Sequence, residues 1–175
     1  MPLRFPSLDR YPDFLDLIAD FDGGSLDGSG FWGDHRPVLT PEGYRAWVAT
    51  LLAEGNTEIE LPAGRVHCSY FWITDADDAW VGFLALRHTL NDFLFEQGGH
   101  IGYSVRPSRR REGHAHSALR EALTRAADLG LDRALITCDD DNVASARTIE
   151  SCGGVWEDTR SDKRRYWAAT TPSDR

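Results

Sequence analysis

Cysteine is scarce in this chain of 175 residues, and no two cysteines stand in a CxxC pair. The three are Cys68, Cys138 and Cys152. An odd number without such spacing argues against a disulfide framework and a structural zinc site, and it is typical of a reducing compartment. His35, His67 and His116 also lack the spacing of metal ligands. We therefore expect no bound metal.

Long apolar runs are absent too. No run approaches the roughly 18 apolar residues that a membrane-spanning helix needs. The first ten residues carry charges and two prolines around no apolar segment, so we expect no signal peptide. Internal repeats and low-complexity segments are likewise missing. The length is ordinary for one domain with a real core, and we expect a single cytoplasmic domain with no membrane partner.

Positive charge is in deficit, and the formal net charge is −9. This balance disfavours nucleic acid as a partner, because phosphate contacts need clustered basic residues. It favours a cationic partner such as an amine, although solubility alone also explains it. Four arginines nevertheless cluster in one stretch: Arg106, Arg109, Arg110 and Arg111. A basic patch on an acidic protein indicates a bound polyanion.

Residues 98–115, GGHIGYSVRPSRRREGHA, are typical of a strand, a basic turn and the start of a helix. The first N–H groups of a helix have no intrahelical partner, and the helix dipole places partial positive charge there. Gly113 would let an anion approach the backbone closely, or it serves simply as a turn glycine. The stretch therefore predicts a phosphate-binding cradle.

Apolar periodicity predicts the remaining elements. Helices are expected over 8–21, 40–55, 111–129 and 142–152. Strands are expected over 65–74, 80–88, 98–106, 133–138, 155–158 and 164–168. Thr40 and Asn142 should cap their helices. Residues 22–33 form a loop whose Phe31 and Trp32 should pack on the body, and 89–97 form a short helical or irregular connection.

This order of elements predicts a mixed α/β sheet with helices on both faces. The strands at 98–106 and 133–138 are joined by a long helix. They should therefore run parallel, with a right-handed crossover.

Residues 110–115, RREGHA, resemble the Arg/Gln-x-x-Gly-x-Gly/Ala signature of the GNAT superfamily of acetyl-CoA-dependent N-acetyltransferases. The signature follows a strand and opens an amphipathic helix, as in that family. Asn142-x-x-Ser145 follows about 30 residues later, and Gly153-Gly154 closes the next helix. The resemblance covers 66–168. Residues 87–103 further resemble a bacterial branch whose substrates are unassigned.

The resemblance implies the GNAT acyl-CoA N-acyltransferase fold. Its mostly antiparallel sheet is splayed between the fourth and fifth strands, which correspond here to 98–106 and 133–138. Residues 1–175 would be one GNAT domain: 1–64 form a helical region on the substrate side, 65–168 the acyl-CoA-binding core and 169–175 a tail. The family is often dimeric, so a homodimer is one expectation.

The resemblance also implies acetyl-CoA as co-substrate. Its pyrophosphate would lie on the N–H groups of Arg110, Arg111, Glu112, Gly113, His114 and Ala115. Arg109 and Arg111 would reach its phosphates or be solvated. Its pantetheine arm would pair with the backbone of Tyr103, Ser104, Val105 and Arg106 and meet the Asn142–Ser145 element. A backbone N–H near Val105 or Arg106 would polarise the thioester carbonyl.

Acetyl transfer needs a neutral amine and a proton for the departing thiolate. Many GNAT members carry a tyrosine for the second task seven residues after the position of Asn142, and here that residue is Ile149. The proton-transfer candidates are Glu96, His100, Glu150, Cys138 and Tyr103. We select Glu96 and His100 as the candidate catalytic residues, because they lie at the upstream edge of the central strand.

The implied activity is acetyl transfer to a primary amine, and the acidic surface favours a small cationic acceptor such as a metabolite, a polyamine or an aminoglycoside-type drug. A peptide or protein N-terminus, or a lysine, is an alternative acceptor. A different acyl donor, such as succinyl-CoA, is another alternative. Ile149 supports a third, a catalytically silent acyl-CoA-binding module. The acceptor pocket would be built from the N-terminal helices, 22–33, 89–97 and the last hairpin.

Overall fold

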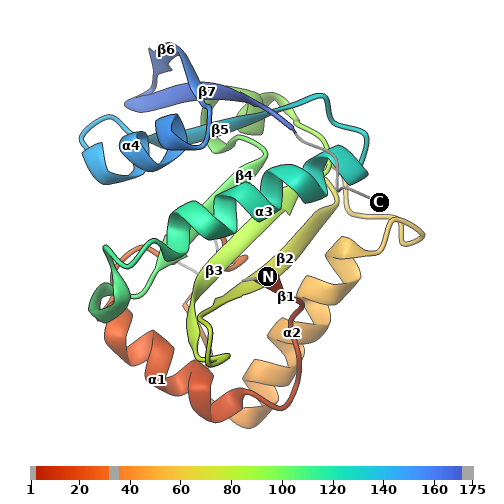
Figure 1. Cartoon of the computed structure of the whole chain (residues 1–175). Coiled ribbons are helices and arrows are strands. Elements are labelled where there is room, and N and C mark those ends of the chain that lie inside the picture. Colours follow the sequence, from red (N-terminus) through yellow and green to blue (C-terminus); the bar gives the residue numbers. More distant parts are fainter. Residues whose placement is uncertain (1–2, 32–35, 171–175) are drawn as a thin grey trace.

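A seven-stranded mixed sheet organises the molecule, seen in a computed structural model that describes residues 3–31 and 36–170 (Figure 1). The strands are β1 Leu3–Arg4, β2 Cys68–Thr74, β3 Trp80–Arg87, β4 Ile101–Val105, β5 Arg133–Asp139, β6 Val155–Arg160 and β7 Lys163–Ala169. Their order is β1-β2-β3-β4-β5-β7-β6, and only β4 and β5 pair in parallel within the described sheet. The expected mostly antiparallel α/β sheet is confirmed.

Helices cover both faces of this sheet (Figure 1). They are α1 Tyr11–Phe21, α2 Pro41–Gly55, α3 His114–Asp128 and α4 Val143–Ser151, with a π-helix η1 at Leu94–Gly98 and a 3-10 turn η2 at Pro107–Arg109. Leu119 of α3 and Ile149 of α4 pack on Ile101 and Ile136 of the sheet. Phe14 of α1 and residues of α2 pack on the opposite face. This face is aromatic: the rings of Trp72 and Trp80 stack at 4.0 Å.

Most elements lie where the sequence predicts them, and the caps are confirmed. Thr40 Oγ1 accepts a hydrogen bond from Gly43 N at 3.1 Å, and Asn142 Oδ1 accepts one from Ser145 N at 3.0 Å. Phe31 stacks on Trp47, at 5.1 Å between ring centroids. Trp32 and Gly33, like residues 171–175 of the expected tail, lie outside the described residues. No helix in the described part of the chain has the length and apolarity to cross a membrane.

Two element boundaries and one short strand differ from the prediction for local reasons. β4 begins at Ile101 rather than at residue 98, because η1 continues to Gly98 and Gly99 has φ +64°. α3 begins at His114 rather than at residue 111, because Arg111 and Gly113 take left-handed backbone conformations. β1 was not predicted, since a strand of two residues has too little periodicity to detect.

The hairpin partner of β4 is shaped by a β-bulge. Ile73 is in register with Gly82 and Thr74 with Trp80, so Val81 is an extra residue on β3. Beside the bulge, a Cβ placed on Gly82 would overlap the carbonyl oxygen of Ser104 on β4. Gly82 therefore permits the close approach that fixes the position of β4.

Replacing Gly82 by alanine should lower the free energy of unfolding by roughly 2 to 3 kcal/mol, because the new methyl group forces β3 and β4 apart. Urea denaturation measures the change. Gly55→Ala is the matched control, since its Cβ would meet its nearest atom, Cys68 O, at an ordinary 3.5 Å. Equal midpoints for the two variants would contradict the packing argument.

Candidate active site

The strands β4 and β5 meet at one end and then part. Ile101 and Ile136 form the one pair in register between them in the described sheet. His100 closes this end: its N–H donates to Leu135 O at 2.7 Å, and its Nδ1 accepts from Leu135 N at 2.9 Å. Beyond this closed end the two strands form a V-shaped opening, which we call the β4–β5 gap. The expected splay between 98–106 and 133–138 is confirmed.

Backbone groups of β4 point into this gap. Arg106 N donates to Val81 O on β3 at 2.8 Å. Because N–H directions alternate along a strand, the N–H groups of Val105 and Tyr103 face the opposite edge, toward β5. Of the two positions expected for the N–H that polarises a thioester, Arg106 is therefore occupied and Val105 faces the gap.

The N-terminus of α3 lies just beyond the end of β4. The first bond of the α3 ladder runs from Ser117 N to Gly113 O at 3.0 Å. The N–H groups of His114, Ala115 and His116 therefore precede the ladder, as an anion site requires. Gly113 has φ +85°, and a Cβ added there would meet nothing within 4 Å. Its glycine is thus required by the backbone conformation, and the space beside it is open.

The arginine cluster divides into two pairs. Arg106 pairs with Asp16 at 2.8 Å and Asp20 at 2.5 Å on α1, and hydrogen bonds from Ser108 and Arg106 lower the pKa of Asp20. Arg109 pairs with Asp75 at 3.0 Å and Glu112 at 2.9 Å.

Arg110 and Arg111 form the second pair. Arg110 Nε donates to Val105 O at 3.0 Å, and Arg111 is exposed. Among the described residues no carboxylate lies within ion-pair distance of either side chain. The backbone N–H of Arg110 donates to Pro107 O at 3.3 Å. This N–H is therefore not free to bind an anion, and the available N–H donors come later in the chain. The charge available to an anion thus comes from Arg110 and Arg111, whereas Arg109 is neutralised.

Tyr103 and Ser145 join β4 to α4. Their hydroxyl oxygens lie 2.9 Å apart. Ser145 is itself fixed by the Asn142 cap. Burial raises the pKa of Tyr103 to about 12, against a smaller lowering by the Ser145 hydroxyl. A hydroxyl pair that stays protonated therefore lies where β4 and β5 have parted.

The other face of the gap is covered by the loop after α1 and by η1. Ser104 Oγ donates to Asp27 O at 2.7 Å, and a Cβ on Gly28 would come within 2.6 Å of Gly102 O. Thr137 Oγ1 on β5 donates to Gln97 O of η1 at 2.7 Å. Glu96, 45% exposed, pairs with Arg160 at 2.9 Å. Glu96 thus lies on the side opposite α3 and α4.

His100 occupies a different place from Glu96. Its side chain is 6% exposed, and burial lowers its pKa to about 4, with a further contribution from Arg87. It lies three residues before Tyr103, roughly 10 Å away at about 3.3 Å per residue of strand. His100 therefore holds β4 and β5 together at the closed end, and its ring does not lie in the open part of the gap.

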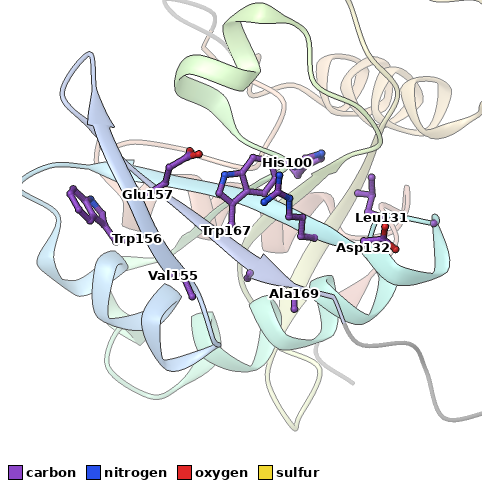
Figure 2. Close-up of a pocket in the computed structure, with 11 residues that line it drawn as sticks. His100, Leu131, Asp132, Val155, Trp156, Glu157, Trp167 and Ala169 are labelled. Carbon is purple, nitrogen blue, oxygen red and sulfur yellow. The ribbon is translucent and has the colours of Figure 1, made fainter.

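A cavity of about 840 Å³ lies at the closed end, between the start of β5 and the end of β7. Figure 2 shows His100 and Trp167 beside each other in it, with ring centroids 6.3 Å apart. Arg133 stacks over the Trp167 ring at 4.1 Å. No residue of the β4–β5 gap lines this cavity, so the candidate active site lies elsewhere.

The remaining proton-transfer candidates lie near α4. Ile149, which stands where many GNAT members carry a tyrosine, is fully buried in the core and has no polar group to donate a proton. Cys138 is 7% exposed on β5, and burial raises the pKa of its thiol above the ordinary value. Glu150 is exposed on α4 and accepts from the Tyr166 hydroxyl at 3.3 Å. Cys138 and Tyr103 both face the core side of the gap.

The family is shown by comparison with known domains. The model described as an acetyltransferase (GNAT) domain matches residues 3–155. The chain therefore belongs to the GNAT family, and it is an acyltransferase by class. The sequence matches none of the curated proteins.

Solved structures share this fold. RimJ of Mycobacterium smegmatis, in complex with CoA-disulfide, has 21% identity and a TM-score of 0.69, with 97% of this chain and 81% of that chain covered. The ribosomal-protein-S5-alanine acetyltransferase of Vibrio fischeri has 16% identity and a TM-score of 0.65, covering 98% and 93%. A mutant of the spermidine N-acetyltransferase SpeG of Vibrio cholerae has 13% identity and a TM-score of 0.61, covering 97% and 95%.

The pH dependence of stability tests the structural task of His100. Between pH 6.5 and 4 the unfolded chain binds a proton at His100 and the folded chain does not. The stability from the neutral ring is complete above pH 6.5 and is lost as the pH falls through this window. This group alone should cost about 3 kcal/mol by pH 4.

His100→Asn keeps an acceptor for Leu135 N but removes the titration. Urea denaturation at pH 7, 5.5 and 4 should therefore give a shallower loss of stability in the variant than in the wild type. Parallel pH curves for the two proteins would show that the pKa of His100 is not lowered in the folded state.

Proposed function

We propose that this chain transfers the acetyl group of acetyl-CoA to a primary amine of a small cationic molecule, in the cytoplasm. The observation that carries the proposal is the parting of β4 and β5 directly in front of the α3 N-terminus. A long ligand with a phosphate at one end and an acyl group at the other fits both features. The bound CoA-disulfide of RimJ supports the same ligand class.

The phosphate end of the ligand would lie on the α3 N-terminus. The N–H groups of His114, Ala115 and His116 precede the helical ladder and supply donors, and the helix dipole adds partial positive charge. Arg110 and Arg111 supply full charges that no carboxylate of the described chain neutralises. The open space beside Gly113 lets a phosphate approach the backbone.

The acyl end would lie in the β4–β5 gap. Acetyl-CoA supplies an acetyl group activated as a thioester. The N–H of Val105 is directed at the gap, and a donor in that place stabilises negative charge on a carbonyl oxygen during acyl transfer. The N–H and C=O of Tyr103 face the same edge of β4 and supply pairing partners for the pantetheine arm.

The acceptor amine would approach from the face covered by η1 and the loop after α1. Glu96 is our candidate for the carboxylate that takes the proton of the amine, and its partner Arg160 is 35% exposed and has a second carboxylate partner in Asp158. The excess of carboxylates in the chain attracts a cation. Spermidine, the substrate named for SpeG, is such a cation. A protein N-terminus is the second candidate acceptor, and the Vibrio fischeri enzyme is named for an alanine of ribosomal protein S5.

Acetyl-CoA binding tests the cradle. At 100 times its dissociation constant, acetyl-CoA should stabilise the wild type by about 2.7 kcal/mol, read as a rise in melting temperature. Gly113→Ala should lose most of this rise, because its methyl group projects into the open space beside the α3 N-terminus.

Gly130→Ala is the matched control for that variant. Gly130 also has φ above +80° and open space around it, but it follows the other end of α3. Both variants bear the same backbone strain, and Gly130→Ala should keep the full acetyl-CoA effect. No rise for the wild type at millimolar acetyl-CoA would refute the assignment of the ligand.

Release of free thiol from acetyl-CoA identifies the acceptor. Spermidine, an aminoglycoside and a peptide with N-terminal alanine are compared at equal concentration, and we expect the polycations to be acetylated faster. If the peptide reacts faster than spermidine and the aminoglycoside, the acceptor is a protein N-terminus and not a small cation. The absence of turnover with every amine, together with binding of acetyl-CoA, would indicate a silent binding module.

Glu96→Gln should lower kcat by roughly 10² or more with whichever acceptor reacts, because the variant has no carboxylate to take the proton of the amine. Glu150→Gln is the control, since Glu150 is an exposed carboxylate on α4 that keeps its hydrogen-bond acceptor as glutamine. Equal rates for the wild type and Glu96→Gln would exclude Glu96 as the base.

A further inference from the structure

The proposed reaction leaves a thiolate, and the usual GNAT donor for it is absent here. The residue at that position, Ile149, is apolar and has no exposed surface. A substitute donor must reach the gap beyond the closed end at Ile101 and Ile136. It must also be protonated at the pH at which a neutral amine attacks.

Tyr103 meets the first requirement by its place on β4. Ile101, Tyr103 and Val105 direct their side chains to the same face of the sheet, where they meet the core formed with α3 and α4. Cys138 on β5 packs in that core too, two residues beyond Ile136. The Tyr103 side chain thus lies at the level at which the two strands have parted.

Ser145 holds the Tyr103 hydroxyl in this place. The two hydroxyl oxygens are 2.9 Å apart, and either can donate. Ser145 N donates to Asn142 Oδ1 at 3.0 Å, so the cap of α4 fixes the serine that meets the tyrosine. The Thr148 side chain also interacts with Tyr103. If Ser145 donates to Tyr103 Oη, the phenolic hydrogen can point either to Thr148 or into the gap, where the sulfur of a bound ligand would accept it.

We propose that Tyr103 donates its phenolic hydrogen bond to the sulfur of coenzyme A during acyl transfer, with Ser145 as the positioning residue. This inference rests on the proposed function. The tyrosine that the family supplies from the helix after the second cofactor element is here supplied from β4.

Tyr103 keeps its own proton during this step. The amine nitrogen forms the new bond to the acyl carbon, and the carbon–sulfur bond breaks with its electron pair left on sulfur. The proton lost by the amine balances the one that sulfur finally takes up through base or solvent. Burial raises the pKa of Tyr103 to about 12, so the hydroxyl stabilises the thiolate as a donor and does not act as a base.

The test uses coenzyme A itself and needs no acceptor. A donor to the thiolate lowers the pKa of the bound CoA thiol, which is measured by the ultraviolet absorbance of the thiolate across a pH titration. The spectrum of the protein alone is subtracted, because the thiols of Cys138 and Cys152, which lie near Tyr103, also absorb in the ultraviolet when they ionise. Tyr103→Phe should raise the pKa of the bound thiol by about one unit relative to the wild type, as expected for loss of one hydrogen bond to a charged group.

Two further comparisons make the result specific. Ser145→Ala should raise the pKa of the bound thiol by a smaller amount, and Ser145→Thr should restore the wild-type value. Tyr70→Phe removes another tyrosine hydrogen bond, to Glu54 Oε2 at 2.8 Å, on the opposite face of the sheet. It should leave the pKa of the bound thiol unchanged.

The outcomes separate the two proposals. Wild-type protein that binds no coenzyme A overturns the proposed function. Tyr103→Phe that binds coenzyme A with a wild-type thiol pKa overturns the role of Tyr103 alone. If Tyr103→Phe does not fold, the serine pair decides: equal thiol pKa values for Ser145→Ala and Ser145→Thr reject the proposal.

Discussion

The two hydrogen bonds between His100 and Leu135 determine where the pairing of β4 with β5 ends. They hold the strands together at the residue before Ile101, and one pair in register follows. Beyond that pair, the N–H groups of β4 that face β5 have no strand partner in the described sheet, and the gap opens toward the α3 N-terminus. His100 can hold this place because burial keeps its ring neutral, with Nδ1 available as an acceptor.

Local sequence predicted the part of the site that local chemistry builds. The turn glycine Gly113, the Asn142 cap and the helix that follows each depend on residues within one turn of chain, and the structure confirms the two helices and the cap. The parallel pairing of β4 with β5 was predictable for the same reason, because a strand, a helix and a second strand in succession favour it. The roles of these residues toward a ligand stay predictions.

Tertiary contacts decided what the sequence could not. His100 and Glu96 stand four residues apart, yet the end of η1 and the conformation of Gly99 send His100 to the closed end and leave Glu96 over the other face. The contact of Asp27 and Gly28 with β4 could not be predicted from periodicity, because these residues lie in a loop. Gly28 alone indicated a close approach of the backbone to another segment. The hydroxyl pair of Tyr103 and Ser145 joins residues 42 positions apart, a distance over which no spacing rule operates.

Ion pairs with carboxylates neutralise two of the four clustered arginines, so only part of the cluster can bind an anion. Four arginines in six positions would form an undirected basic patch, but α1 and the β2–β3 turn supply carboxylates that neutralise Arg106 and Arg109. The charges left for an anion are those of Arg110 and Arg111, which precede Gly113 by three and two residues in the chain. The formal net charge of −9 disfavours the approach of anions to the chain in general. Under the proposed function, an extended ligand that also enters the β4–β5 gap would gain contacts that a free phosphate cannot make, and these contacts would offset the repulsion.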